Sequence, residues 1–242
     1  MPQKTYFISD AHLGLGSREE EREKENRLIA FFDHIKNDAR EVFIAGDLFD
    51  AWFEYRTVIP KGFHRLFAKL DELTEKNISV HYLAGNHDYW MRDFFRDELG
   101  MITHYDPITA IIDGKKILIH HGDGLATNDA GYRILKKVLR NKFNIWLYTW
   151  LHPDLGLAIA RSSPKKSRLY TSTKDYGEED GMMKFAREKI NEGYDIVIMG
   201  HRHAPVCKEI GSGMYINLGD WIHHNTYACL ENGRMTLNSW KQ

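Results

Sequence analysis

Five short motifs rich in aspartate and histidine occur along the chain, and their side chains are of the types that bind divalent metal ions. In chain order they are Asp10-Ala11-His12, Gly46-Asp47, Gly85-Asn86-His87-Asp88, His120-His121-Gly122-Asp123 and Gly200-His201-Arg202-His203. Mixed oxygen and nitrogen ligands suit Mn, Fe or Zn better than metals that prefer sulfur. Two such ions that share a carboxylate can activate water at neutral pH and hold phosphoryl oxygens during in-line attack. The motifs therefore predict metal-dependent phosphoryl chemistry.

The spacing within two of these motifs favours chelation. Asp10 and His12, like His201 and His203, are two positions apart, so an extended backbone would turn both side chains of a pair to the same side. Any single motif is weak evidence, because Asp-x-His often arises by coincidence and Gly-Asn-His-Asp can form an ordinary turn. Glycines adjoin the motifs where the backbone would have to approach the ions closely: Gly46, Gly85, Gly122 and Gly200. Five motifs in order make a shared site the better interpretation.

Each motif closely follows a short apolar run of the kind that forms a strand buried on both faces. These runs cover residues 6–8, 42–45, 80–84, 117–119 and 196–199. Apolar residues with helical spacing lie between the first three runs, so strand and helix alternate as in an α/β domain. Parallel strands end at one edge of their sheet, where α/β proteins place their reactive groups. The motifs should therefore meet at one edge.

The second half of the chain has a different pattern. Asp113-Gly114 between two apolar runs predicts a hairpin, since glycine accepts the positive φ of such turns. The runs 214–218, 226–230 and 235–237, separated by turn residues, predict a β meander. Between the hairpin and the meander, residues 129–174 place Leu, Ile and Trp on more than one face of two expected helices, joined near His152-Pro153. We expect two packed sheets flanked by helices, with this helical insertion beside them.

The composition is that of an ordinary folded domain. Of the 242 residues, 43% are hydrophobic and 28% charged, which fits a single domain covering 1–242. The formal net charge of −1 provides no basic excess for nucleic acid, so none is expected as a partner. The sequence has no signal-peptide pattern and no apolar stretch long enough to span a bilayer. We therefore expect a cytoplasmic protein that meets a membrane only from its surface, if at all.

The order Asp-x-His, Gly-Asp, Gly-Asn-His-Asp, His and Gly-His-x-His resembles the calcineurin-like metallophosphoesterase superfamily over nearly the whole chain. The resemblance implies a four-layer α/β/β/α sandwich and a site for two divalent ions, with Mn the first choice. It assigns Asp10, His12, Asp47 and His203 to one ion, and Asp47, Asn86, His121 and His201 to the other. His87, paired with Asp88, would face the leaving group. His120 precedes the ligand His121 and should point the other way along the strand.

Within the superfamily, residues 46–52 and 121–132 resemble the UDP-2,3-diacylglucosamine pyrophosphatases of bacterial lipid A synthesis. Those enzymes hydrolyse a lipid-linked nucleotide-sugar to UMP and 2,3-diacylglucosamine 1-phosphate, and a helical insertion after His-Gly-Asp caps their site and receives the acyl chains. The resemblance implies that 129–174 has this role here, and it leaves open a peripheral contact with the cytoplasmic face of the inner membrane. It also implies substrate contacts for Asn86, Asp129, Tyr132, Lys165, Lys166 and Arg168.

Two features depart from the better-known form of these enzymes. His87 stands where that form has Arg, and 52–56 reads Trp-Phe-Glu-Tyr-Arg where it has Gly and acidic residues. The alternatives are a soluble nucleotide-sugar or another phosphodiester as the substrate, or a non-catalytic binding protein on the same scaffold. The insertion could equally be a subdomain with its own core or a dimer surface. The basic residues near 165 could form a solvated loop or a contact with anionic lipid headgroups.

Overall fold

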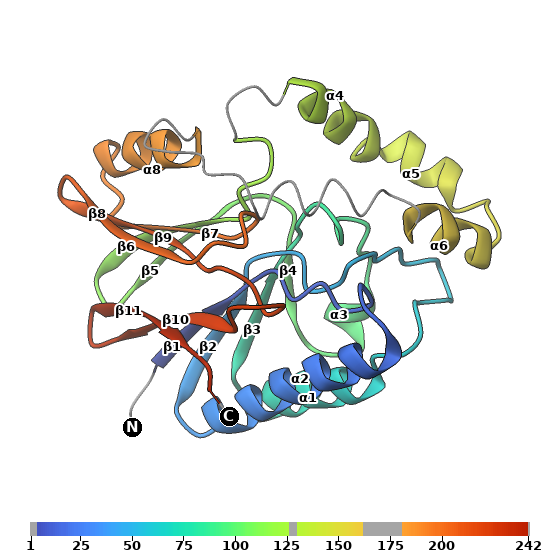
Figure 1. Cartoon of the computed structure of the whole chain (residues 1–242), viewed down its shortest axis with the longest axis horizontal. Helices are drawn as coiled ribbons and strands as arrows, with labels where there is room; N and C mark the ends of the chain where they lie inside the picture. Colours follow the sequence, from blue (N-terminus) through green and yellow to red (C-terminus); the bar gives the residue numbers. More distant parts are fainter. Residues whose placement is uncertain (1–3, 126–129, 162–180, 242) are drawn as a thin grey trace.

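The computed structural model describes residues 4–125, 130–161 and 181–241, and its strands form two sheets (Figure 1). The first sheet contains β1 (Lys4–Ile8), β2 (Ala39–Ile44), β3 (Ser79–Leu83), β4 (Ile102–His104), β10 (Thr226–Glu231) and β11 (Arg234–Ser239). The second contains β5 (Ile108–Ile112), β6 (Lys115–His120), β7 (Ile196–Met199), β8 (Val206–Ile210) and β9 (Gly213–Asn217). Their strand orders are β11-β10-β1-β2-β3-β4 and β5-β6-β7-β9-β8.

Helices cover the outer face of each sheet. The first sheet packs against α1 (Arg18–Ile35), α2 (His64–Glu75) and the short α3 (Phe94–Asp97), and the second packs against α8 (Gly181–Asn191). A third apolar core, which includes Phe7 and Ile198, lies between the two sheets. Three cores between four layers confirm the expected α/β/β/α sandwich. Outside these layers lie α4 (Ala130–Leu139), α5 (Lys142–Tyr148) and α6 (Pro153–Arg161), as Figure 1 shows.

The crossover helix α1 sets the geometry of the first two motif loops. Ser17 caps its start: the Ser17 hydroxyl accepts the Glu20 N–H, and the Glu20 carboxylate accepts the Ser17 N–H. One face of the helix is fully buried against the sheet, including Phe31 and Phe32. Because a helical crossover joins parallel strands, β1 and β2 run side by side in the same direction, with Ile8 opposite Ile44. Their carboxyl ends therefore lie at one edge of the sheet.

The carboxyl ends of the second sheet meet the same edge of the molecule. The parallel strands β6 and β7 end with His120 opposite Met199. Past these ends, the Gly200 N–H donates to the His121 carbonyl over 2.9 Å. The Asp10 carboxylate accepts the His201 N–H over 2.8 Å, which ties the second sheet to the first. The predicted meeting of the motifs at one edge is confirmed.

The predicted hairpin at Asp113 joins β5 to β6 as an antiparallel pair, but the predicted C-terminal meander is wrong. β10 and β11 form a hairpin in the first sheet, whereas β9 pairs with β7 and β8 in the second. β9 is buried on both faces, with Tyr215 in the core beneath α8 and Ile216 in the core between the sheets. A nearly continuous apolar strand fits either sheet by pattern alone. The sequence pattern therefore does not indicate that the chain passes from the second sheet to the first between β9 and β10.

The helical insertion also differs from the expected pair of helices. Within residues 130–161 there are three helices, because the first expected helix is broken at Asn141. The Asn141 side-chain oxygen accepts the N–H groups of Phe143 and Asn144 at 2.9 and 3.3 Å, which starts a new helix there. None of the described helices has the length and apolar character needed to cross a membrane.

Candidate metal centre

The loops that follow β1 and β2 run alongside each other and carry the first three predicted ligands. The Asp10 N–H donates to the Gly46 carbonyl at 3.1 Å, and the His12 N–H donates to the Asp47 carbonyl at 3.0 Å. Asp10, His12 and Asp47 all have left-handed backbones, with φ of 55°, 44° and 54°. Such values are uncommon outside glycine and concentrate where a protein must aim side chains at a functional site. The predicted ligands His201 and His203 share this feature, with φ of 67° and 58°.

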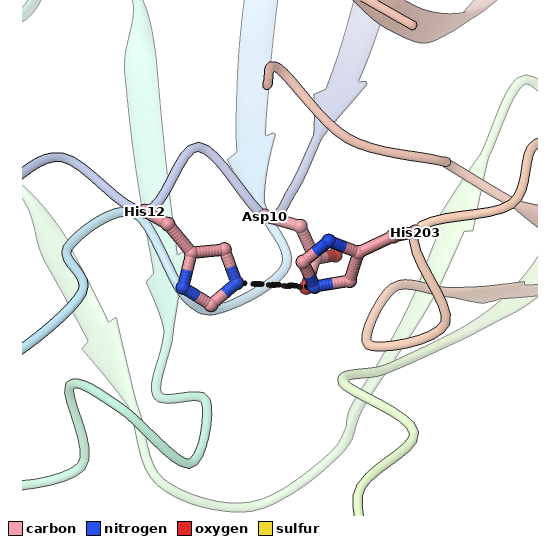
Figure 2. A group of neighbouring side chains, drawn as sticks. All are labelled: Asp10, His12 and His203. Atoms are coloured by element: carbon pink, nitrogen blue, oxygen red, sulfur yellow. Dashed lines mark hydrogen bonds and ion pairs between the residues drawn. The ribbon is translucent and has the colours of Figure 1, made fainter. Parts of the chain in front are cut away.

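Asp10, His12 and His203 form one cluster of converging ligand atoms (Figure 2). The Nε2 atoms of His12 and His203 face each other 3.2 Å apart. Both also approach Asp10 Oδ1, at 3.7 and 3.5 Å. This carboxylate oxygen is buried and makes no hydrogen bond with any described residue. Two imidazole nitrogens around an unsatisfied buried carboxylate oxygen form a donor set that fits a divalent ion.

Asp47, His121 and His201 form a second cluster beside the first. His121 Nε2 lies 3.2 Å from Asp47 Oδ2 and 3.0 Å from the Asn86 side-chain oxygen. The same Asp47 oxygen lies 3.6 Å from Nε2 of His12 in the first cluster. Asp47 thus stands between the clusters, where a carboxylate shared by two ions would have to lie.

The protonation of the two clusters also fits cation binding. Burial alone lowers the pKa of His12, but the nearby carboxylates of Asp10 and Asp50, followed by that of Asp47, outweigh it and raise the pKa to about 9. Burial likewise lowers the pKa of His121, while the charge and hydrogen bond of Asp47 raise it to about 10. Burial lowers the pKa of His201 to about 4, so that ring stays neutral. Without metal the carboxylates attract protons to the rings, and a divalent cation would replace those protons.

In three of the histidines, the Nδ1 atom on the far side of the ring from the cluster lies near an oxygen atom. His121 Nδ1 donates to the Ala45 carbonyl at 2.9 Å. His12 Nδ1 lies 3.5 Å from the Asp50 carboxylate, and His203 Nδ1 lies 3.6 Å from the Asp220 carboxylate. Such contacts fix the orientation of a metal-binding ring.

Three glycines of the motifs leave room for the ligands. A Cβ at Gly46 would overlap His121 Nδ1, a Cβ at Gly85 would overlap Asp47 Oδ1, and a Cβ at Gly200 would overlap Asp10 Oδ2. The groups that come close to these glycines are side chains of predicted ligands, so the absence of a Cβ leaves space for those side chains. Gly46 has in addition a φ of 94°, which side-chain-bearing residues rarely adopt.

Comparison with known proteins decides the family. A sequence model of the calcineurin-like phosphoesterases matches residues 3–205. The chain belongs to the calcineurin-like phosphoesterase family. A protein of Porphyromonas gingivalis named UDP-2,3-diacylglucosamine hydrolase is 35% identical over 99% of this chain and 98% of its own length. A protein of the same name from Histophilus somni is 30% identical, over 90% of this chain and 92% of its own. The chain is therefore a metal-dependent phosphoesterase, and its clusters are candidate sites for divalent ions.

The Gly85–Asp88 loop of this phosphoesterase differs in one respect from expectation. His87 does not pair with Asp88: its Nδ1 lies 2.8 Å from the Asp50 carbonyl, and its ring centroid lies 4.8 Å from that of His12. Asp88 is fully buried and accepts hydrogen bonds from the N–H groups of Gly85 and Leu48 and from the Tyr82 hydroxyl. Asp88 therefore joins the two ends of its own loop and ties the loop to β3, while His87 remains beside the first cluster.

The predicted substrate contacts are only partly described by the structure. Asp129, Lys165, Lys166 and Arg168 lie outside the described residues. Tyr132, on α4, donates its hydroxyl to Asp123 at 3.1 Å, and its ring centroid is 6.4 Å from that of His201. His120 is turned away from the clusters as expected, with its Nδ1 accepting the Gly122 N–H and its ring next to Phe185 of α8.

Three acidic residues of the phosphoesterase have roles that the sequence did not reveal: Asp50, Asp123 and Asp220. Asp50 and Asp220 contact the rings of His12 and His203. Asp50 follows Asp47 by three positions and Asp123 belongs to one of the five motifs, but neither position indicates which group the carboxylate contacts. Asp220 had no local signal, because the ring it contacts comes from another loop.

Proposed function

We propose that this chain hydrolyses the pyrophosphate bond of UDP-2,3-diacylglucosamine to UMP and 2,3-diacylglucosamine 1-phosphate, as a step of lipid A biosynthesis. The main support is that relatives named UDP-2,3-diacylglucosamine hydrolase match this chain over nearly their full length. A second support is the metal centre, in which each predicted ligand lies in or beside one of the two clusters.

Two ions, which we propose to be Mn²⁺, would supply activation of water and neutralisation of phosphoryl charge when bound. In the proposed assignment one ion is held by Asp10, His12, Asp47 and His203, and the other by Asp47, Asn86, His121 and His201. The left-handed backbones and the contacts behind the rings hold these ligands in place before any ion binds. Such preorganisation is what stabilisation of transition-state charge requires.

His87 is the residue that we propose acts on the leaving group. The Asp50 carbonyl can only accept a hydrogen bond, so Nδ1 of His87 must carry the proton of that contact. Nε2 of His87 is then the atom available to the substrate. When it is protonated, it can donate to the oxygen of the departing sugar 1-phosphate. Asp88 contributes by fixing the loop rather than by touching the substrate.

The lipid end of the substrate would lie against the insertion. Large apolar side chains remain exposed on it: Ile134, Leu135, Val138, Leu139, Phe143, Trp146, Leu147, Trp150, Leu155 and Ile159. Each acyl methylene buried against such groups contributes about 0.8 kcal/mol. Asp129 and Tyr132 would contact the sugar, and Lys165, Lys166 and Arg168 its phosphate, since cations bind phosphate well.

We further propose that the same apolar face brings the enzyme to the cytoplasmic face of the inner membrane, where a diacylated substrate resides. Trp146 and Trp150 have 51% and 74% of their surface exposed, which is unusual for tryptophan. Lys137 and Lys142 lie close by in the sequence and would face anionic headgroups.

Parallel assays test the proposed substrate. Purified protein with Mn²⁺ is given UDP-2,3-diacylglucosamine in mixed micelles and, separately, UDP-N-acetylglucosamine, and UMP release is measured. We expect hydrolysis of the acylated compound at least about 100-fold faster, because burial of the acyl chains adds binding energy that the unacylated sugar lacks. Equal turnover would instead favour a soluble nucleotide-sugar or phosphodiester. No turnover of any phosphoester with Mn²⁺, Fe²⁺ or Co²⁺ would favour a binding protein.

A further inference from the structure

Asp123 lies two residues after the proposed ligand His121, and its side chain contacts three side chains of the insertion. Its Oδ2 atom is 2.8 Å from Lys136 Nζ, 3.0 Å from an Arg140 guanidinium nitrogen and 3.1 Å from the Tyr132 hydroxyl. The Asp123 side chain is 3% exposed, whereas those of Lys136 and Arg140 are 24% and 22% exposed. A buried carboxylate with two cationic partners and a hydroxyl donor is strongly held, and removing it would leave those partners uncompensated.

Arg140 extends this connection to a second ligand loop. The same guanidinium nitrogen lies 3.4 Å from the carbonyl of Gly85, next to Asn86, and the guanidinium stacks 4.2 Å above the ring of Tyr89. The indole N–H of Trp90 donates to the Leu139 carbonyl at 2.8 Å, at the end of α4. The end of α4 is therefore attached to two of the loops that carry proposed ligands of the second ion, those of Asn86 and His121.

The far end of the insertion has its own apolar contact with the body of the protein. Tyr148 of α5 packs against Phe53 and Trp90, with ring centroids 4.7 Å away in both cases. A Cβ at Gly156 of α6 would overlap the Tyr55 hydroxyl. Phe53 and Tyr55 come from residues 52–56, where the sequence departs from the better-known form. No proposed ligand takes part in this contact, and Asp123 is not part of it.

We propose that Asp123 is a positioning residue that holds α4 at a fixed position relative to the metal centre. The insertion can then bind the acylated sugar while the ions bind the phosphates of the same substrate molecule. The substrate in this statement rests on the function proposed above. Because the carboxylate is in the loop of His121 and its partners are on α4 or directly after it, a shift of one element is transmitted to the other. Asp123 makes no contact with the reacting atoms in this role.

The test uses Asp123→Asn in the full chain. We expect the KM for UDP-2,3-diacylglucosamine to rise about tenfold with kcat changed less than about threefold, since a charge-assisted contact that aids binding is lost. Protease cleavage within 130–161 should accelerate, because the insertion is released from the body. The number of Mn²⁺ ions bound should stay the same. Asp154→Asn is the matched control, since Asp154 is an exposed carboxylate of α6, and it should change neither KM nor cleavage.

Lys136→Met removes one cationic partner of Asp123 and leaves the carboxylate intact. This variant therefore tests the proposal if Asp123→Asn does not fold. It should raise KM in the same direction, and the double variant should raise KM no further than the larger single effect. Unchanged KM and cleavage in both variants would overturn the proposal, and so would loss of a bound ion in Asp123→Asn. If the wild type fails to hydrolyse the lipid substrate, the proposed function fails, while faster cleavage in both variants still supports the positioning role.

Discussion

Asp220 holds the ring of His203 from the side opposite to Asp10. One carboxylate oxygen of Asp220 lies 3.6 Å from Nδ1 of His203, while Nε2 of the same ring lies 3.5 Å from Asp10. The other oxygen of Asp220 accepts the backbone N–H groups of residues 222–224, so the carboxylate is itself fixed. Asp220 is 1% exposed. A carboxylate behind a metal-binding imidazole sets both its orientation and its basicity.

Replacing Asp220 with Asn should weaken binding of the first ion. Asn keeps the oxygen that accepts the backbone N–H groups but removes the negative charge behind His203. Loss of such a partner typically lowers metal affinity about 10- to 100-fold. Titration calorimetry with Mn²⁺ measures this, with His223→Gln as a control because the His223 side chain is exposed and only its backbone N–H bonds to Asp220. An Mn²⁺ affinity equal to that of the wild type would show that Asp220 does not support the site.

Gly85→Ala should inactivate the metal centre because it displaces Asp47, the proposed bridging ligand. The new Cβ would overlap both the carboxylate and the backbone nitrogen of Asp47, and neither can move without shifting the loop. We expect kcat/KM to fall by about 100-fold or more, because displacements near 1 Å have effects of this size. Gly131→Ala, whose Cβ would have nothing within 4 Å, should retain wild-type activity. Equal activity of the two variants would contradict the geometry described for Asp47.

Exchange of Trp146 and Trp150 for Ser should weaken attachment to lipid. Each indole that leaves an apolar phase loses roughly 1.5–3 kcal/mol, so vesicle affinity should fall at least about tenfold. Sedimentation with vesicles of phosphatidylethanolamine and phosphatidylglycerol measures the bound fraction. Ile111→Ser is the control, because Ile111 is 79% exposed but lies on β5, outside the insertion. Undiminished sedimentation of the double variant would place the membrane contact elsewhere.

His81 makes the stability of the metal-free protein depend on pH. Its ring stacks on Phe43 at 4.3 Å and its Nδ1 lies 3.1 Å from Nε2 of His104. Burial, and then the charge of His104, lower the pKa of His81 to about 4. Between that value and the unfolded pKa near 6.5 the unfolded chain binds more protons, so stability falls as pH drops through this window.

The matching variant is His81→Phe, which keeps the stacking on Phe43 and removes the titration. In urea unfolding with chelator present, the wild type should lose more stability than His81→Phe between pH 7 and pH 5, by roughly 1 kcal/mol after allowance for partial exposure. Identical losses in the two proteins would rule out His81 as a source of the pH dependence.

The sequence was informative where local pattern and chemistry coincide. Asp10, Asp47 and His121 each follow a short apolar run, and parallel strands bring such positions to one edge, so the grouping of ligands was predictable. The sheet containing β9 was not predictable, because a strand buried on both faces has no periodicity that points to a neighbour. The break at Asn141 was likewise hidden within a continuous apolar pattern.

The supporting residues could not be predicted for a different reason. Asp220 and His203 belong to different loops, and Asp123 meets Arg140 only once α4 is placed beside the loop that follows β6. Contacts of this kind depend on tertiary distance, which spacing along the chain does not encode. The pairing of His87 with Asp88 was implied by the family resemblance, yet the two side chains contact different partners, the Asp50 carbonyl and the Tyr82 hydroxyl.

Hydrolysis of UDP-2,3-diacylglucosamine in ¹⁸O-labelled water tests the central claim most directly. Wild-type protein with Mn²⁺ is incubated with the substrate, and both products are weighed by mass spectrometry. Attack of water on the phosphorus nearest to uridine predicts UMP that carries one ¹⁸O atom and unlabelled 2,3-diacylglucosamine 1-phosphate. Label in the sugar phosphate, or intact substrate after prolonged incubation, would contradict the proposed reaction.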